Sequence, residues 1–156
     1  MSILLSSASG QLRVAIESVY SVKHNPICDS LALYANSMLV QNLPECSKLE
    51  MDCLLNTKTA AAMASLGSVG GGINTAAAHH VGGIFDVPHG EANAIMLPHS
   101  MRFNAQSSAD LQAMIAQAMG VDIAGKSDYE AALAAADAVE ELRDSLGLPN
   151  RLRDVG

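Results

Sequence analysis

Apolar residues recur at intervals of three and four positions along nearly the whole chain, and this spacing limits the possible folds more than any other feature. Segment 9–24 is typical, because Leu12, Ile16 and Val19 fall on one side of a helix of about 3.6 residues per turn. No segment alternates apolar and polar residues over the length of a strand. The pattern therefore predicts an all-α protein, a bundle of helices without a sheet.

Proline and glycine mark where these helices begin and end. Pro26 and Pro44 suit the first turns of a second and a third helix, where the amide proton that proline lacks is not needed. The glycine-rich segment 67–72 ends the third helix, and Pro98 is expected to kink the fifth. The expected helices cover residues 9–24, 26–43, 44–66, 73–81, 88–104, 107–119 and 127–146.

Two serines are the expected start signals of the last two helices. Ser127 and Glu130 form a capping box, in which each side chain bonds the other residue's backbone amide. Ser107 and Asp110 have the same spacing, with Asp in place of the usual Glu or Gln. Gly147 is the expected stop signal of the final helix.

The composition limits partners and location. The length of 156 residues predicts a single helical domain over 1–156, with no nucleotide-binding domain. Only 16% of residues are charged, against roughly 25% in an average domain. We therefore expect a homo-oligomer, or a partner protein that covers apolar surface.

Charge and hydropathy exclude several classes of partner. The net charge of −7 and the nine scattered basic residues disfavour nucleic acid. No apolar run reaches the roughly 18 residues that span a membrane, and the N-terminus lacks the basic start of a signal peptide. The expected location is the cytoplasm, where Cys28, Cys46 and Cys53 would be reduced thiols.

Four of the five histidines lie in the segment HHVGGIFDVPHGEANAIMLPH, residues 79–99. Imidazole is both a frequent metal ligand and the usual acid or base near neutral pH. A helix that begins near Pro88 directs its free amide groups toward any ligand beside His89, which favours an anion. Because His79 and His80 cannot share one helix face, at most one of them is expected to line the site. The segment predicts a pocket for a small carboxylate or carbonyl compound, although a buried histidine is more often hydrogen-bonded scaffold.

The histidine segment resembles a known signature. The run His79-x-x-Gly-Gly-x-Phe-Asp-x-Pro-His89, followed by Gly90, Asn93-Ala94 and Leu97-Pro98-His99, resembles the iron-containing alcohol dehydrogenase family. Its first part is most similar to the maleylacetate reductase branch. Segments 9–33 and 151–156 also resemble this family. The resemblance implies the helical domain that follows a nucleotide-binding domain in family members.

The resemblance also implies a degenerate metal site. The family binds a divalent metal, iron or zinc, through an Asp, a His four residues later and two further His. These positions read Gly10, Val14, Thr75 and His89 in this sequence, so only one can ligate. Catalytic metal sites usually need about three protein ligands. We therefore expect no metal and no NAD(P) cofactor, unless a site has been rebuilt from His79, His80, His89 and Asp86.

The sequence leaves three functions open. The preferred one is a repurposed enzyme that performs metal-free acid–base chemistry on a small carbonyl or carboxylate compound, such as an aromatic ring-fission product. The second is the substrate-domain half of an NAD(P)-dependent oxidoreductase with a separate nucleotide-binding partner. The third is a non-catalytic interaction module or remnant, against which the intact caps and apolar stripes argue. The candidate catalytic residues are His79, His89 and Thr75, and the candidate substrate-binding residues are His80, Asp86, Gly83 and Glu17.

Overall fold

The computed structural model describes residues 2–48 and 50–155, and this part of the chain is helical and contains no strand. The expected all-α class is therefore confirmed. The α-helices are α1 (Ser2–Val19), α2 (Pro26–Asn42), α3 (Met51–Leu66), α4 (Ile73–Phe85), α5 (His89–Asn104), α6 (Ala109–Ala118) and α7 (Asp128–Ser145), with short 3-10 helices at Glu45–Lys48 and Leu152–Asp154.

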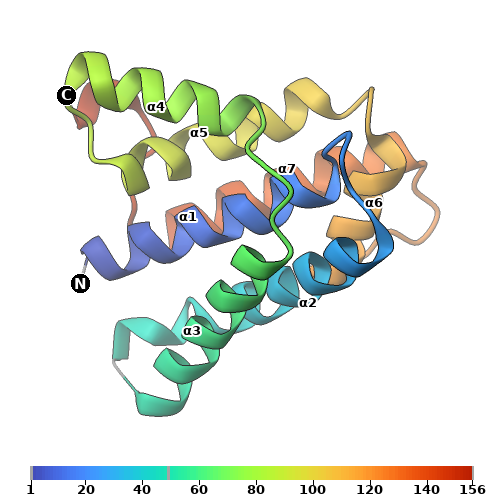
Figure 1. Ribbon diagram of the computed structural model, residues 1–156, viewed down its shortest axis with the longest axis horizontal. Helices are drawn as coiled ribbons and strands as arrows, with labels where there is room; N and C mark the ends of the chain where they lie inside the picture. The colour runs from blue at the N-terminus through green and yellow to red at the C-terminus, as the bar shows by residue number, and fades with distance from the viewer. Residues whose placement is uncertain (1, 49, 156) are drawn as a thin grey trace.

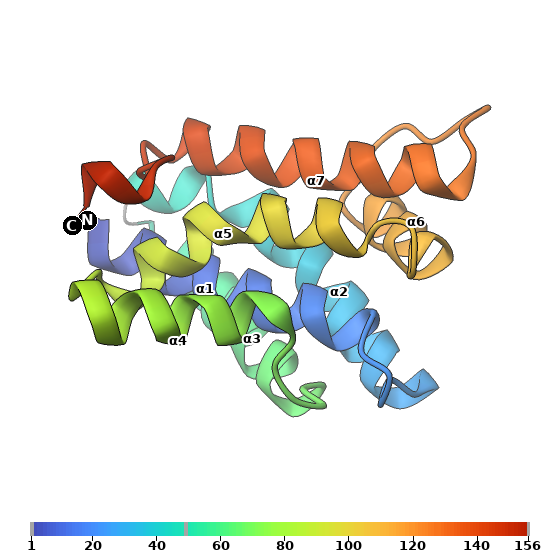
Figure 2. The ribbon, with the colours of Figure 1, turned by 90° about the horizontal axis from the view of Figure 1, so that it is seen from above.

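Helix α1 runs through the middle of the bundle (Figure 1). The α2–α3 pair packs on one side of it, and α5, which carries α4 on its outer side, packs on another. Figure 2 shows α7 running along α5, with α6 at the end of this pair. Helix α4 packs mainly against α5, so much of its surface faces outward.

The core is built from a few large aliphatic side chains and many alanines. Ile16, Leu39 and Leu97 are almost fully buried at the centre. Alanine permits close approach of neighbouring helix backbones because its side chain is a single methyl group, and it also favours the helical state. The alanines that pack into this central cluster are Ala8, Ala15, Ala32, Ala35, Ala60, Ala64, Ala116, Ala135 and Ala136.

Three helix borders differ from the expected ones in the first third of the chain. Helix α1 begins at Ser2 rather than residue 9, because Leu5 and Ala8 extend its buried stripe. It ends at Val19 rather than residue 24, because the chain turns there toward α2, where Asn25 caps the helix by accepting from the Cys28 amide. The expected single helix over 44–66 is wrong in its first turns, which form a 3-10 helix before α3 starts at Met51.

Three predicted borders of the later helices agree only in part with the structure. Helix α4 continues through Gly82 and Gly83 to Phe85, four residues beyond the expected end. The capping box of Ser127 and Glu130 is confirmed. The Ser107 start signal is wrong, because Ser108 is the residue before α6 and the Ser107 hydroxyl instead donates to the Asn104 carbonyl.

The three cysteines are free, as expected, and two of them are buried. Cys46 and Cys53 pack with Leu5 in a small cluster away from the histidines of α4. Burial raises the pKa of Cys53 to about 11, which suppresses the reactive thiolate. Among the described helices, none combines the length and the apolar character that crossing a membrane would require.

Candidate functional site

Glu17 ties the start of α4 to the middle of α1. Its side chain is fully buried, and Oε1 accepts a hydrogen bond of 2.8 Å from the backbone amide of Asn74. That amide is in the first turn of α4, where backbone donors have no partner within the helix. A carboxylate there also faces the positive end of the helix dipole. Glu17 thus anchors α4 and does not face solvent.

Arg13 and Thr75 complete this polar cluster. Thr75 Oγ1 donates to Glu17 Oε2 at 2.5 Å and accepts from Arg13 Nη1 at 2.6 Å. The same Arg13 nitrogen lies 3.5 Å from Glu17 Oε2, and the Arg13 side chain is 13% exposed. The arginine is therefore held mainly by the threonine hydroxyl and only loosely by the carboxylate.

Glycine makes this approach possible. A Cβ atom added to Gly72 would lie 2.6 Å from Glu17 Oε1, and one added to Gly71 would lie 2.6 Å from the Thr75 side chain. Both distances are far below van der Waals contact. The glycine-rich segment before α4 therefore allows the backbone to pass beside the Glu17 carboxylate.

A second buried network joins α4 to α5 and holds the backbone at His89. Asn74 Nδ2 donates to Asn93 Oδ1 at 3.0 Å, and Asn93 Nδ2 donates to the His89 carbonyl at 2.8 Å. Ser100 Oγ donates to Asn74 Oδ1 at 3.3 Å. Asn74 and Asn93 are both fully buried, where an unsatisfied amide would be costly. The network fixes the start of α5 relative to α4.

His79 and His89 are brought together at this junction. Their ring centroids are 5.1 Å apart and their planes are tilted by 34°. Both residues are exposed overall. Partial desolvation, His79 and the Arg13 guanidinium lower the pKa of His89, which favours the neutral form of its imidazole. A neutral imidazole can donate one hydrogen bond and accept another.

The other predicted residues do not join this pair. His80 follows His79 on α4 and is exposed, as are Gly83 and His99. A Cβ atom added to Gly83 would meet nothing within 4 Å. Asp86 is exposed at the end of α4 in the left-handed conformation, with φ of 55°. Among the described residues, none of these positions forms a hydrogen bond or ion pair with His79 or His89.

The residues present do not fit a divalent metal. Gly10 has space, because an added Cβ would lie 4.0 Å from Asn93 Nδ2, but glycine has no ligating atom. Val14 packs against the apolar core. The Thr75 hydroxyl is engaged by both Glu17 and Arg13, which leaves His89 as a single imidazole. Within residues 2–48 and 50–155, no three His, Cys, Asp or Glu side chains lie together in a way that could hold a metal, so the rebuilt site has no support.

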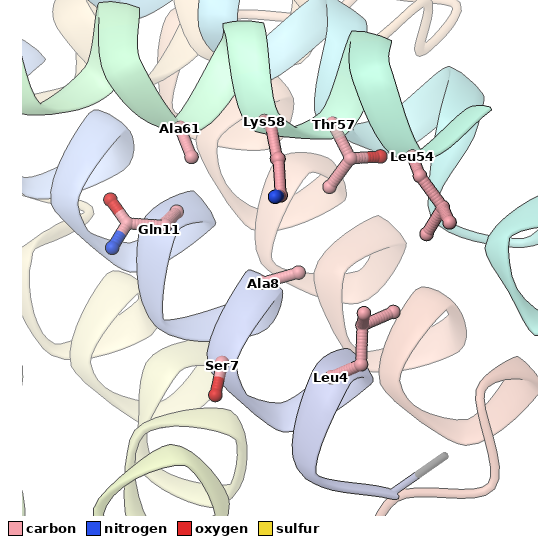
Figure 3. Close-up of a pocket in the computed structure, with 8 residues that line it drawn as sticks. All are labelled: Leu4, Ser7, Ala8, Gln11, Leu54, Thr57, Lys58 and Ala61. Carbon is pink, nitrogen blue, oxygen red and sulfur yellow. The ribbon is translucent and has the colours of Figure 1, made fainter. Parts of the chain in front are cut away.

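A groove lies elsewhere, between α1 and α3, and has a volume of about 530 Å³. Figure 3 shows its lining, in which Lys58 brings the only charged group. None of the candidate catalytic or substrate-binding residues lines this groove. The lining residues on α1 are on a different face of that helix from Arg13 and Glu17.

Arg13 is the residue of the cluster that the sequence reasoning missed. Its spacing of four residues from Glu17 is the usual signal of an ion pair along a helix. That spacing alone does not indicate contact with Thr75, which lies 62 positions further along the chain. Asn93 belonged to the matched signature, but its hydrogen bond to the His89 carbonyl required the folded structure.

Comparisons with known proteins give one consistent result. The model of the Fe-containing alcohol dehydrogenase family, C-terminal part, matches residues 10–156. The 1,3-propanediol dehydrogenase of Klebsiella pneumoniae is 35% identical over 97% of this chain and 41% of its own length. Maleylacetate reductase 1 of Rhodococcus opacus is 36% identical over 76% of this chain and 34% of its own length.

A solved structure agrees with these sequence matches. The alcohol dehydrogenase from Oenococcus oeni superposes with a TM-score of 0.94 at 28% identity, over 97% of this chain and 41% of that one. The chain therefore spans about a third to two fifths of the length of these relatives.

Proposed function

Because the chain belongs to the iron-containing alcohol dehydrogenase family, as its C-terminal helical part, we propose that it is the substrate-domain half of an NAD(P)-dependent oxidoreductase. In this function a nucleotide-binding portion, on the same polypeptide or a separate one, completes the enzyme. The observation that carries the proposal is the extent of the match, which covers nearly all of this chain but only 41% of a dehydrogenase. The relatives compared above are named as dehydrogenases or reductases.

The uncovered face around α4 supports the need for a second portion. His79, His80 and His89 are exposed there, and on the same helix Ile84 and Phe85 are 65% and 64% exposed. Exposed apolar side chains beside polar candidate residues are typical of a surface that another domain covers. A domain seated on this face would exclude water from the His79–His89 pair.

The chain's own residues have distinct roles in this proposal. His79 and His89 would hydrogen-bond the oxygen of a small carbonyl or alcohol substrate, and Thr75 and Glu17 would orient Arg13 beside them. A bound nicotinamide would supply or accept the hydride. No step is assigned to a metal, because the ligating side chains do not fit one. His80, Asp86 and Gly83 have no role in this proposal.

The metal-free, non-redox enzyme preferred from the sequence gains no support from the relatives. It rests on the His79–His89 pair alone, since two neighbouring imidazoles could act as acid and base. Turnover of a hydrolase or isomerase substrate by this chain alone, abolished in His89→Ala, would favour it over the oxidoreductase half.

The finer expectations belong to the same proposal. The similarity to maleylacetate reductase 1 supports a substrate with a carboxylate group, such as an aromatic ring-fission product. The low charged fraction of 16% supports burial of surface in a homo-oligomer or against a partner protein. We place the enzyme in the cytoplasm, where nicotinamide cofactors are available.

The test is complementation with a nucleotide-binding portion. The N-terminal part of the Klebsiella pneumoniae 1,3-propanediol dehydrogenase is expressed as a separate chain and mixed with this one. We expect co-elution on size exclusion and NAD(P)H-dependent reduction of a small aldehyde that neither chain performs alone. Phe85→Glu should weaken the association, whereas Phe103→Glu, at an exposed position near the far end of α5, should not. Absence of association at micromolar concentrations would contradict the proposal.

A further inference from the structure

We infer that the Arg13 guanidinium is the cationic group of this site, in place of a divalent metal, and that it binds a carboxylate of the ligand beside His89. The inference names the ligand class of the proposed oxidoreductase site and rests on that proposal for its biological meaning. Its physical basis is independent, because it depends only on residues of this chain.

The guanidinium of Arg13 lies where a divalent metal would be expected. Arg13 lies on α1 between Gly10 and Val14, two positions that the family resemblance marks as metal-ligand positions. Its Nη1 atom is 2.6 Å from Thr75 Oγ1, the side chain at a third such position. A metal ion bound by Thr75 would have to approach the same oxygen that the guanidinium already occupies. The two cations are therefore alternatives at this point of the structure.

The positive charge of Arg13 is only partly neutralised by its neighbours. The Glu17 carboxylate makes its short contacts with the Asn74 amide and the Thr75 hydroxyl, at 2.8 and 2.5 Å. Its distance to Arg13 Nη1 is 3.5 Å. Arg13 Nε is buried and has no hydrogen-bond partner among the described residues. The arginine therefore keeps part of its positive charge, and its side chain is 13% exposed, so that a ligand can reach it.

Arg13 and the groups near it suit a carboxylate ligand. Guanidinium matches a carboxylate in shape and can donate two parallel hydrogen bonds to it. His79 follows Thr75, the hydrogen-bond partner of Arg13, by four residues on α4, and the His79 ring lies 5.1 Å from that of His89. His89 also begins α5, where the N-cap residue Pro88 makes no side-chain cap hydrogen bond. Positive charge, imidazole and a helix start converge on one place.

The experiment measures ligand binding by the purified chain without added metal. The probe is succinate, and the uncharged control is succinamide. Binding of each is measured by calorimetry and by the NMR signals of the His79 and His89 rings. We expect succinate to bind and to shift both ring signals, and succinamide to do neither. Arg13→Gln should weaken succinate binding by about 10- to 100-fold, the usual effect of losing a charge-assisted hydrogen bond.

Two variants separate a charge effect from a structural one. Arg13→Lys keeps the charge and should keep most of the binding. Arg102→Gln removes an arginine that pairs with Asp137 and Glu140, and should leave binding unchanged. Equal succinate affinity in the native chain and Arg13→Gln would overturn the inference. So would equal binding of succinamide, or succinate binding that requires added Zn²⁺ or Fe²⁺.

The outcome is also separable from that of the complementation test. Succinate binding needs no second polypeptide and no turnover. If the nucleotide-binding portion fails to associate but succinate binding depends on Arg13, the oxidoreductase proposal fails and the ligand assignment stands. If the complex forms and is active while Arg13→Gln binds succinate normally, the oxidoreductase proposal stands and the ligand assignment fails.

Discussion

Replacement of Glu17 by alanine should destabilise the protein by about 3–5 kcal/mol, the usual cost of removing one member of a buried charged cluster. The carboxylate is fully buried and accepts from the Asn74 amide, the Thr75 hydroxyl and Arg13. Without it, a buried backbone donor loses its acceptor and a largely buried guanidinium loses the neighbouring negative charge. The gain in helix propensity from alanine is about 0.5 kcal/mol or less and does not offset this loss.

Glu17→Gln separates the charge from the anchor. The glutamine carbonyl can still accept from the Asn74 amide, but the negative charge near Arg13 is lost. We expect a smaller cost of about 1–3 kcal/mol. The matched control is Glu45→Ala, because Glu45 is 56% exposed and its ion pair within the described part of the chain is with Lys48 at the surface. Such exposed pairs contribute about 0–1 kcal/mol.

Urea unfolding followed by circular dichroism measures these differences. With a slope near 2 kcal/mol/M, Glu17→Ala should lower the midpoint by about 1.5–2.5 M. Hydrogen exchange at the Asn74 amide should accelerate in Glu17→Ala and stay slow in Glu17→Gln. The reasoning is refuted if Glu17→Ala costs no more than Glu45→Ala, because the buried carboxylate would then not anchor α4.

Three further predictions concern other parts of the molecule. Gly90→Ala places a Cβ atom 2.8 Å from the Ser6 backbone and should destabilise the protein by at least about 1–3 kcal/mol. The Cβ atom of Gly83→Ala meets nothing within 4 Å, so this variant should be neutral or stabilising by up to about 1 kcal/mol. Thermal melts measure both changes, and equal effects would contradict this contrast. Ser127→Ala should cost about 1 kcal/mol by removing the capping box. Because the Ser127 backbone and side-chain hydrogen bonds lower the pKa of Glu130 in the folded state, their stabilisation is present above the ordinary value near 4.5 and is lost as the pH falls through the folded pKa. In Ser127→Ala this pH dependence should shrink, and an unchanged unfolding profile between pH 2 and 5 would contradict it. Finally, protein purified without a tag should contain well under about 0.3 equivalents of iron or zinc by mass spectrometry, since a catalytic site needs about three protein ligands; one tightly held equivalent would show that the ligand assignment is wrong.

The sequence by itself determined the helices and most of their borders. Apolar spacing and start or stop residues act locally, within about one or two turns, so they can be read without the fold. The capping box of Ser127 and Glu130 shows this best, since both partners lie three positions apart. Errors occurred where local signals competed, as at Ser107, or where packing extended a helix, as at Leu5 and Ala8 in α1.

The family, and the absence of ligating atoms at Gly10 and Val14, were also available from the sequence. A motif such as the one from His79 to His89 is a pattern of residue types at fixed spacing, and it needs no coordinates. The chemistry of Gly10 and Val14 is equally plain, because neither side chain has an atom that can ligate a metal.

Only the tertiary structure decided which polar groups meet. The contact of Arg13 with Thr75 spans 62 positions, and that of Glu17 with the Asn74 amide spans 57. It is likewise the rotation of α4 against α5 that pairs His79, and not His80, with His89. Such contacts depend on how helices pack and rotate against one another, which residue spacing within a single helix does not specify. The site is therefore formed by helix packing, although the sequence shows the types and local spacing of its residues.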